Sequence, residues 1–405
     1  MKKTIVLVGR LDSKGEEYAF VKERILKGDF EVVVVDVGTR GTPRFKPEIS
    51  RAEVAKAGGV EMKDVVDRSD ENKEIQTMMR GAAVTARRLF DAGKLDGIMA
   101  LGGSRGTAIG TSAMRALPFG VPKVMVSSIA SGDMRPYVAT KDIMVVHSVT
   151  DILGLNRMTR AVLANATAAI TGAVEQGGVS EVSSKGLIAM SSMGGVNRLV
   201  FGVQKALEDG GHETVAFHAV GTGGRAMEEI IGQGLVNAVL DLVTHEVTDH
   251  VLGGYYDAGE SRLETAGAMG IPQVVVPGCI DFIAFSPPDR VPEQMKGRAV
   301  FMHTPEVAII RANKTEMESV GKAIASKLNK ATGPTAVFIP MKGFSPGNRE
   351  GRALYDPEAD RAFVEALKRD LRTSVRVVEM NAHINDEAFA QRAVQLLEEL
   401  IKGKT

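Results

Sequence analysis

The segment Ile5-Val-Leu-Val-Gly-Arg-Leu-Asp-Ser-Lys-Gly-Glu16 joins a short apolar run to a polar turn that contains two glycines. An apolar run of this length that ends at such a turn is typical of a strand buried on both faces of a parallel sheet. Tyr18, Val21 and Ile25 follow at spacings of three and four, which predicts a helix with one apolar side. The segment therefore predicts a strand, a turn and a helix, the repeating unit of an α/β fold.

The same succession recurs 183 residues later, where Ile188-Ala-Met-Ser-Ser192 is followed by Gly195-Val-Asn-Arg198. Further pieces recur in the same order, because 121–126 resembles 271–276 and 145–148 resembles 301–304. A duplicated order of strands and helices indicates a duplicated domain. We therefore expect two Rossmann-like, mostly parallel, doubly wound α/β domains of similar layout. The boundary is expected near Val179–Lys185, which gives domains of residues 1–182 and 183–405.

Composition narrows the class of protein. Fifty basic and fifty acidic residues among 405 give zero formal net charge, so no overall field attracts nucleic acid or an anionic membrane. No stretch approaches the length of a transmembrane helix. The single cysteine, Cys279, cannot form an internal disulfide and is expected to be a small buried residue, which favours a cytoplasmic protein. The absence of net repulsion and the nineteen methionines predict self-association, as a symmetric homodimer.

The strand ends of the first half carry an unusual number of glycines and hydroxyl groups. In a doubly wound sheet, ligands bind beyond the carboxyl ends of the strands. Glycine turns, helix N-termini and hydroxyls there supply donors to phosphate. The candidate binding residues are Asp12, Ser13, Lys14, Gly38, Thr39, Gly102, Gly103, Ser104, Gly106, Thr107, Ser131, Gly132 and Asp133. They predict a nucleotide or phosphate site, although tight turns alone also require glycine.

Three familiar motifs are absent or weak. Nowhere does Gly-Lys-Ser/Thr follow a glycine at the Walker A spacing, which excludes a P-loop NTPase. Gly221–Ala226 matches G-x-G-x-x-A, with Asp241 downstream, but it follows the second strand of its domain rather than the first, so it is a weak dinucleotide signal. His245 and His250 are five residues apart, which is the wrong spacing for a zinc helix; the segment is expected to be a loop at a strand end, and no metal site is predicted.

The second half has its own polar strand ends. His218, Glu228, Asp281 and Arg311 are the candidate catalytic residues, because such groups together can hold and polarise a carboxylate or phosphate. Glu228 has the alternative interpretation of a solvated helix residue. If the strand ends of the two halves face each other, His218, Asp281 and Arg311 would line a small-molecule site between the domains.

A family resemblance joins these motifs. Asp12–Glu16, Val37–Thr39, Gly102–Thr107, Ser131–Asp133, His218–Glu228 and His383–Asp386 together resemble an uncharacterised bacterial and plant family that includes the tomato mosaic virus resistance protein. The resemblance covers essentially the whole chain. It implies two Rossmann-like halves, an ATP-binding site in the first of them, and self-association.

With ATP in that site, Asp12 and Asp133 are expected to contact the ribose or a nucleotide-bound Mg²⁺, and Lys14 to balance phosphate charge. The resemblance implies no reaction, so two classes of function stay open. One is an adenine-nucleotide-binding protein in which ATP is structural or regulatory. The other is a metabolic enzyme that acts on a small carboxylate or phosphorylated metabolite between the domains.

Overall fold

The computed structural model describes residues 2–65, 70–177 and 186–403. The chain divides into two compact units, residues 1–180 and 181–405, referred to below as the N-terminal and C-terminal units. The predicted boundary, Val179–Lys185, lies outside the described residues. Among the described residues, no helix is both long enough and apolar enough to cross a bilayer.

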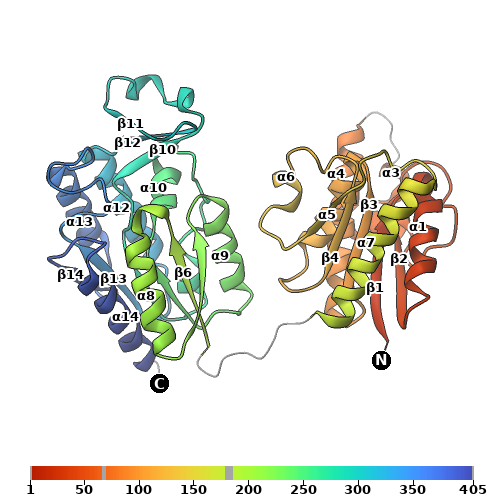
Figure 1. The fold of residues 1–405 in the computed structure, drawn as a ribbon, viewed down its shortest axis with the longest axis horizontal. Coiled ribbons are helices and arrows are strands. Elements are labelled where there is room, and N and C mark those ends of the chain that lie inside the picture. Colours follow the sequence, from red (N-terminus) through yellow and green to blue (C-terminus); the bar gives the residue numbers. More distant parts are fainter. Residues whose placement is uncertain (1, 66–69, 178–185, 404–405) are drawn as a thin grey trace. The chain divides into compact units, whose positions relative to one another are not determined.

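The N-terminal unit is built on one parallel sheet of five strands in the order β2-β1-β3-β4-β5 (Figure 1). Its strands are β1 (Lys3–Gly9), β2 (Phe30–Asp36), β3 (Gly97–Gly102), β4 (Lys123–Ser127) and β5 (Met144–His147). Strand β1 pairs with β2 on one side and with β3 on the other, both in parallel register. The carboxyl ends of all five strands therefore meet at one edge of the sheet.

Helices cover both faces of this sheet. Its helices are α1 (Leu11–Ile25), α2 (Arg51–Ala57), α3 (Met62–Val65), α4 (Glu71–Asp91), α5 (Ser104–Arg115), α6 (Arg135–Val138) and α7 (Arg157–Gln176). Apolar residues of α1 and α7 pack on one face, and those of α2, α4 and α5 on the other. Tyr18, Val21 and Ile25 of α1 are fully buried, which confirms the predicted apolar side of that helix.

The C-terminal unit repeats this layout with a six-stranded parallel sheet in the order β14-β13-β9-β8-β6-β7. Its strands are β6 (Leu187–Ser192), β7 (Glu213–His218), β8 (Ala238–Asp241), β9 (Gln273–Val275), β13 (Thr335–Pro340) and β14 (Arg376–Met380). Strand β6 lies between β7 and β8 as β1 lies between β2 and β3, and β4 and β9 are the fourth strands of their units. The predicted α/β class, with two Rossmann-like sheets of similar layout, is confirmed.

One predicted repeat is wrong. Residues 145–147 belong to β5 of the parallel sheet and Ser148 follows it, whereas 301–304 belong to β11 (Val300–Thr304) of a separate antiparallel sheet. That three-stranded sheet has the order β10-β12-β11, with β10 (Phe282–Phe285) and β12 (Val307–Arg311). It gathers at one end of the C-terminal unit (Figure 1). Two short apolar strands resemble each other in sequence whichever sheet they join, because strand composition does not encode the pairing partner.

The helices of the C-terminal unit include one that the sequence did not predict. They are α8 (Asn197–Asp209), α9 (Thr222–Gly232), α10 (His245–Leu252), α11 (Thr265–Ala268), α12 (Lys314–Leu328), α13 (Pro357–Asp370) and α14 (Glu387–Lys402), with 3₁₀ turns η1 (Gly194–Val196), η2 (Pro288–Arg290) and η3 (Glu293–Met295). Helix α10 occupies the segment that was expected to be a loop. All but one of its first five residues are polar, yet all five are buried, so the segment shows no amphipathic pattern to read.

Candidate functional site

The N-terminal cavity lies at the carboxyl edge of the parallel sheet, between the turn after β1 and the turn after β3. Its volume is about 290 Å³. It is lined by Arg10, Ser13, Lys14, Leu101, Gly102, Gly103, Ser104, Arg105, Gly106 and Asp151. Six of the predicted binding residues are therefore brought together: Ser13, Lys14, Gly102, Gly103, Ser104 and Gly106.

The turn after β3 brings backbone close to the cavity. Gly102 has φ +158°, and a Cβ there would stand 3.0 Å from the Cα of Gly106, so the two glycines permit the tight entry into α5. Gly103 precedes the first residue of α5, and within the described chain no side chain caps that helix. The N–H groups of the first turn of α5 are therefore free to bind an anion.

The turn after β1 supplies cations to the same cavity. Helix α1 begins at Leu11 but is kinked at Lys14, whose φ of −129° and ψ of 23° are not helical. The ammonium group of Lys14 donates a hydrogen bond to the carbonyl of Ile152, in the segment after β5. Arg10 and Arg105 add two guanidinium groups, of which Arg10 is paired with Asp12 at 3.5 Å and Arg105 with Glu71. The lining is therefore predominantly cationic.

Asp12, Gly38 and Thr39 are not among the lining residues. The Asp12 carboxylate accepts hydrogen bonds from the backbone N–H groups of Thr39 and Arg40, at 3.1 and 2.8 Å, and so holds the loop after β2. The Thr39 hydroxyl donates to Glu74 in α4. Gly38 lies against Asp12, where a Cβ would come within 2.8 Å of its carboxyl carbon. These residues shape the rim rather than the cavity.

Thr107 and the segment after β4 also lie elsewhere. Thr107 is completely buried, and its hydroxyl is 2.8 Å from that of Ser127 at the end of β4. Ser131, Gly132 and Asp133 are exposed, and the Asp133 carboxylate is paired with Arg135 at 2.8 Å. The Arg135 guanidinium lowers the pKa of Asp133 below its usual value. Of the four predicted strand-end loops, only those after β1 and β3 reach the cavity.

Four of the lining residues, Arg10, Leu101, Arg105 and Asp151, were not among the predicted binding residues. Asp151 is the only carboxylate among those that line the cavity. It follows β5, the fifth strand of the sheet, and its side chain is exposed. The signal was available, because a carboxylate after the last parallel strand lies at the same edge as the glycine turns. Asp151 is therefore the carboxylate beside the cavity, where Asp12 and Asp133 were expected.

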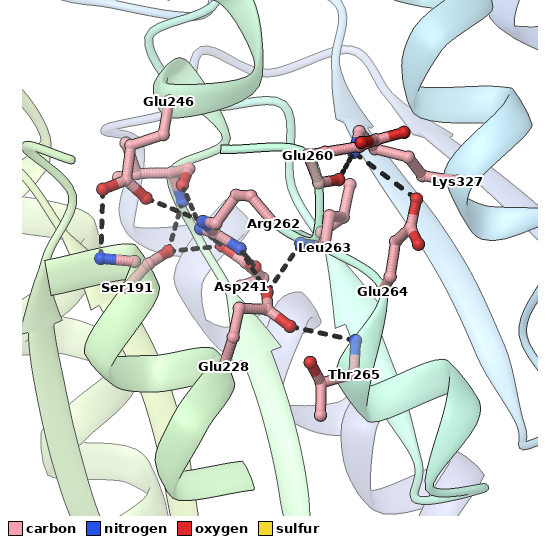
Figure 2. Close-up of polar contacts among 12 residues, drawn as sticks. Ser191, Glu228, Asp241, Glu246, Glu260, Arg262, Leu263, Glu264, Thr265 and Lys327 are labelled. Carbon is pink, nitrogen blue, oxygen red and sulfur yellow. Dashed lines mark hydrogen bonds and ion pairs between the residues drawn. The ribbon is translucent and has the colours of Figure 1, made fainter. Parts of the chain in front are cut away.

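In the C-terminal unit, Glu228 belongs to a buried ion cluster, not to an open rim. The Arg262 guanidinium is fully buried and pairs with Asp241, Glu246 and Glu228 (Figure 2). Both Glu228 oxygens also accept backbone hydrogen bonds, from Leu263 at 2.6 Å and Thr265 at 2.9 Å. The expectation of Glu228 as a catalytic base is therefore not supported: its lone pairs are occupied by groups that fix the fold.

The same cluster fills the G-x-G-x-x-A turn. Glu246 of α10 accepts hydrogen bonds from the backbone N–H groups of Gly221 and Gly224, at 2.6 and 3.0 Å. These are the donors that a dinucleotide pyrophosphate would use at the start of α9. Because a protein carboxylate already occupies them, the turn is not a dinucleotide site.

Asp281 and Arg311 contact each other, and neither is among the residues that line a cavity with His218. Asp281 is completely buried and accepts a hydrogen bond from the Ser345 hydroxyl at 2.7 Å. Arg311 donates to the Asp281 carbonyl at 2.7 Å and to the Asp360 carboxylate at 2.6 Å. Burial raises the pKa of Asp360 to about 7, although Arg311 acts in the opposite direction. Arg311 ends β12 of the antiparallel sheet, whereas His218 ends β7 of the parallel sheet.

Among residues 2–65, 70–177 and 186–403, no group of three or more His, Cys, Asp or Glu side chains is arranged to hold a metal ion. His245 and Asp249 come close, at 3.2 Å, but both are completely buried. The His245 Nδ1 lies 2.8 Å from the Cys279 carbonyl, which makes it a donor. The pair is accounted for by contacts within the unit.

Fold and site together define a two-unit Rossmann-like α/β protein with a polar cavity at a strand edge. The chain belongs to the family described as "Uncharacterised protein family (UPF0261)": residues 3–178 match its N-terminal domain and residues 185–401 its C-terminal domain. Its relatives include a UPF0261 protein of Clostridium tetani, 44% identical over 391 residues that cover 96% of this chain and 97% of the relative.

The plant resemblance is also confirmed. The ToMV resistance protein Tm-1(GCR237) of Solanum lycopersicum is 33% identical over 419 residues, which cover 96% of this chain and 55% of that protein. Among solved structures, the chain resembles a putative UDP-N-acetylglucosamine 2-epimerase from Listeria monocytogenes, with a TM-score of 0.24, 12% identity, and coverage of 68% of this chain and 79% of that one. A superposition at this level carries no argument about function.

Proposed function

We propose that the N-terminal unit binds an adenine nucleotide, with its phosphate groups in the N-terminal cavity. The observation that carries the proposal is the arrangement of an uncapped helix N-terminus, a glycine turn and Lys14 around one cavity. Backbone N–H groups, a helix dipole and a lysine are the chemistry that proteins use for phosphate. The family resemblance supports ATP as the nucleotide.

The basic and acidic lining residues are suited to different parts of the nucleotide. Lys14 and Arg10 lie on the β1 side and Arg105 on the β3 side, so that phosphate oxygens between them meet cations from two directions. Asp151 is the carboxylate suited to a ribose hydroxyl or to the Mg²⁺ that accompanies ATP. We infer this role for Asp151 in place of Asp12 and Asp133. The Asp12 carboxylate accepts from the backbone N–H of Arg40 and pairs with Arg10, and the Asp133 carboxylate pairs with Arg135.

The cavity volume limits how much of the nucleotide is enclosed. About 290 Å³ lies at the lower end of the range for ligand pockets. The triphosphate fits within it, and the adenosine then extends over the rim.

Calorimetric titration with ATP and Mg²⁺ tests the proposal. Lys14→Gln removes a cation from the cavity and is expected to weaken ATP binding about tenfold, since hydrogen bonds to charged groups are worth ~1.5–3 kcal/mol. Lys27→Gln is the matched control: Lys27 is an exposed lysine just after the same helix and should leave affinity unchanged. Equal affinity of the wild type and Lys14→Gln would contradict the proposed site.

Phosphate release in the same samples separates the two classes of function. A nucleotide that is structural or regulatory is expected to remain intact over many hours with the protein alone. Turnover that appears only when a small carboxylate or phosphorylated metabolite is added would instead place the chain among enzymes.

A further inference from the structure

We propose that the C-terminal unit contains a second, independent binding site, for a small organic anion with an apolar body. The site is a cavity of about 890 Å³, referred to as the C-terminal cavity. Its walls come from the segments at the ends of β6, β7, β9, β13 and β14, together with the small antiparallel sheet. Strand ends of a doubly wound sheet are where ligands bind, and this volume lies in the upper part of the usual range for ligand pockets.

The charged side chains that line the cavity are all positive. Three arginines, Arg198, Arg349 and Arg352, line the cavity, and none of its lining residues is an aspartate or glutamate. Arg349 is paired with Asp386 at 3.1 Å. Within the described part of the chain, Arg198 and Arg352 have no ion pair, so their charge is available to a ligand. A cavity with unpaired guanidinium groups and no carboxylate favours an anion.

The backbone at the start of α8 also favours an anion. Gly194 and Gly195 of η1 line the cavity directly before α8, a helix of thirteen residues. Among the described residues, no side chain caps that helix. Arg198 lies in its first turn, so the helix dipole and a guanidinium act on the same part of the cavity.

The rest of the lining combines polar side chains, among them His218, Tyr256 and His303, with an apolar surface. Phe282, Phe301 and Ile309 come from the antiparallel sheet, and Leu354 from the loop after β13. Phe282 and Ile309 are buried, whereas Phe301 is half exposed. An inorganic ion would leave this surface uncovered, which is why the ligand is inferred to carry an apolar group.

Two lining residues argue for binding without covalent chemistry. Burial raises the pKa of the Cys279 thiol well above its usual value, so it is a poor nucleophile. The His383 Nε2 donates to the Ser345 carbonyl at 2.9 Å, and its Nδ1 accepts from the Asn385 N–H at 3.1 Å. Burial lowers the pKa of His383, which keeps the ring neutral. The Cys279 thiol and the His383 ring therefore form part of the cavity wall and are not reactive centres.

Titration calorimetry with three aryl probes tests the site: phenyl phosphate, phenylacetate and the neutral phenylacetamide. Both anions share the chemistry inferred here, and their relative affinities show whether phosphate or carboxylate is preferred. We expect at least one anion to bind more than about tenfold tighter than the amide, because only an anion can pair with the guanidinium groups. Added ATP should not compete if the two sites are separate.

Arginine variants locate the binding. Arg198→Gln and Arg352→Gln are each expected to weaken binding of the preferred anion about tenfold. Arg225→Gln is the matched control, an exposed arginine in α9 outside the cavity lining, and should have no effect. Because all three arginines are exposed, unchanged thermal melting is expected in every variant. The proposal is overturned if phenylacetamide binds as tightly as both anions, if neither anion binds at millimolar concentration, or if Arg198→Gln and Arg352→Gln bind as the wild type does.

Discussion

The Asp241 carboxylate and the Arg262 guanidinium form two parallel contacts inside the C-terminal unit, from Nη1 to Oδ2 at 2.5 Å and from Nη2 to Oδ1 at 2.8 Å. Arg262 also donates through Nε to Glu246 at 2.7 Å, and it is completely buried (Figure 2). Ser191 at the end of β6 donates to the same Asp241 carboxylate at 2.6 Å. The cluster therefore joins β6, β8, α9 and α10 through one guanidinium.

Removing the guanidinium should be costly. Arg262→Met leaves the carboxylates of Asp241, Glu246 and Glu228 without their cation in the interior, and breaking a buried pair in this way costs about 3–5 kcal/mol. Urea denaturation should show a loss of this size in the free energy of unfolding. Arg225→Met, on the exposed side of α9, is expected to change it by less than about 0.5 kcal/mol. If the two variants were equally stable, the cluster would not be holding the unit together.

Two glycines of α9 should respond oppositely to alanine. A Cβ at Gly224 would stand 1.9 Å from Glu246 Oε2, so Gly224→Ala should destabilise the unit by about 2–3 kcal/mol. At Gly232 the nearest atom to a Cβ is 3.5 Å away, which is ordinary contact, and alanine favours the helix by up to ~1 kcal/mol. Thermal melting of the two variants measures both effects. A melting temperature unchanged by Gly224→Ala would mean that Glu246 does not occupy the turn.

Asp360 predicts a pH dependence of stability. Its pKa in the folded chain is about 7 because of burial, against an ordinary value of 3.8. The folded state then holds a proton that the unfolded state has released, so this contribution is complete below pH 3.8 and is lost as the pH rises to 7. Asp360→Asn cannot titrate, so its free energy of unfolding should fall less between pH 5 and pH 7, by about 1–2 kcal/mol. Urea denaturation across that interval measures the difference, and parallel curves for the two proteins would contradict the raised pKa.

Much of the fold is readable because the relevant signals are local. The sequence predicts a helix over 357–371, which is observed at Pro357–Asp370. Phe389, Ala393, Leu396 and Leu397 recur at spacings of four, three and one, which predicts one apolar side of a helix, and all four are buried in α14. The antiparallel sheet and α10 were not predicted. Their residues carry no periodic signal, since α10 begins with buried polar groups whose partners, Arg262 among them, are distant in sequence.

The N-terminal cavity was predictable only in part, because the contacts of its candidate residues involve partners that are distant in sequence. Gly102, Gly103 and Lys14 follow strands that the sequence identifies, so their gathering at one edge follows from parallel pairing. Whether a strand-end polar group faces a cavity depends on its partners. Asp12 Oδ2 accepts a backbone hydrogen bond from Arg40, and the Thr107 hydroxyl lies beside that of Ser127; sequence spacing predicts neither contact. Self-association, which rests on charge and composition alone, stays a prediction.

The most direct test of the nucleotide site is a crystal structure of the chain with Mg²⁺ and a non-hydrolysable ATP analogue. The account predicts triphosphate density between the turns that carry Lys14 and Gly103, with the phosphates at the N-terminus of α5 and Asp151 beside the ribose or the Mg²⁺. Triphosphate density beside Ser131–Asp133, or in the C-terminal cavity with the N-terminal cavity empty, would contradict it.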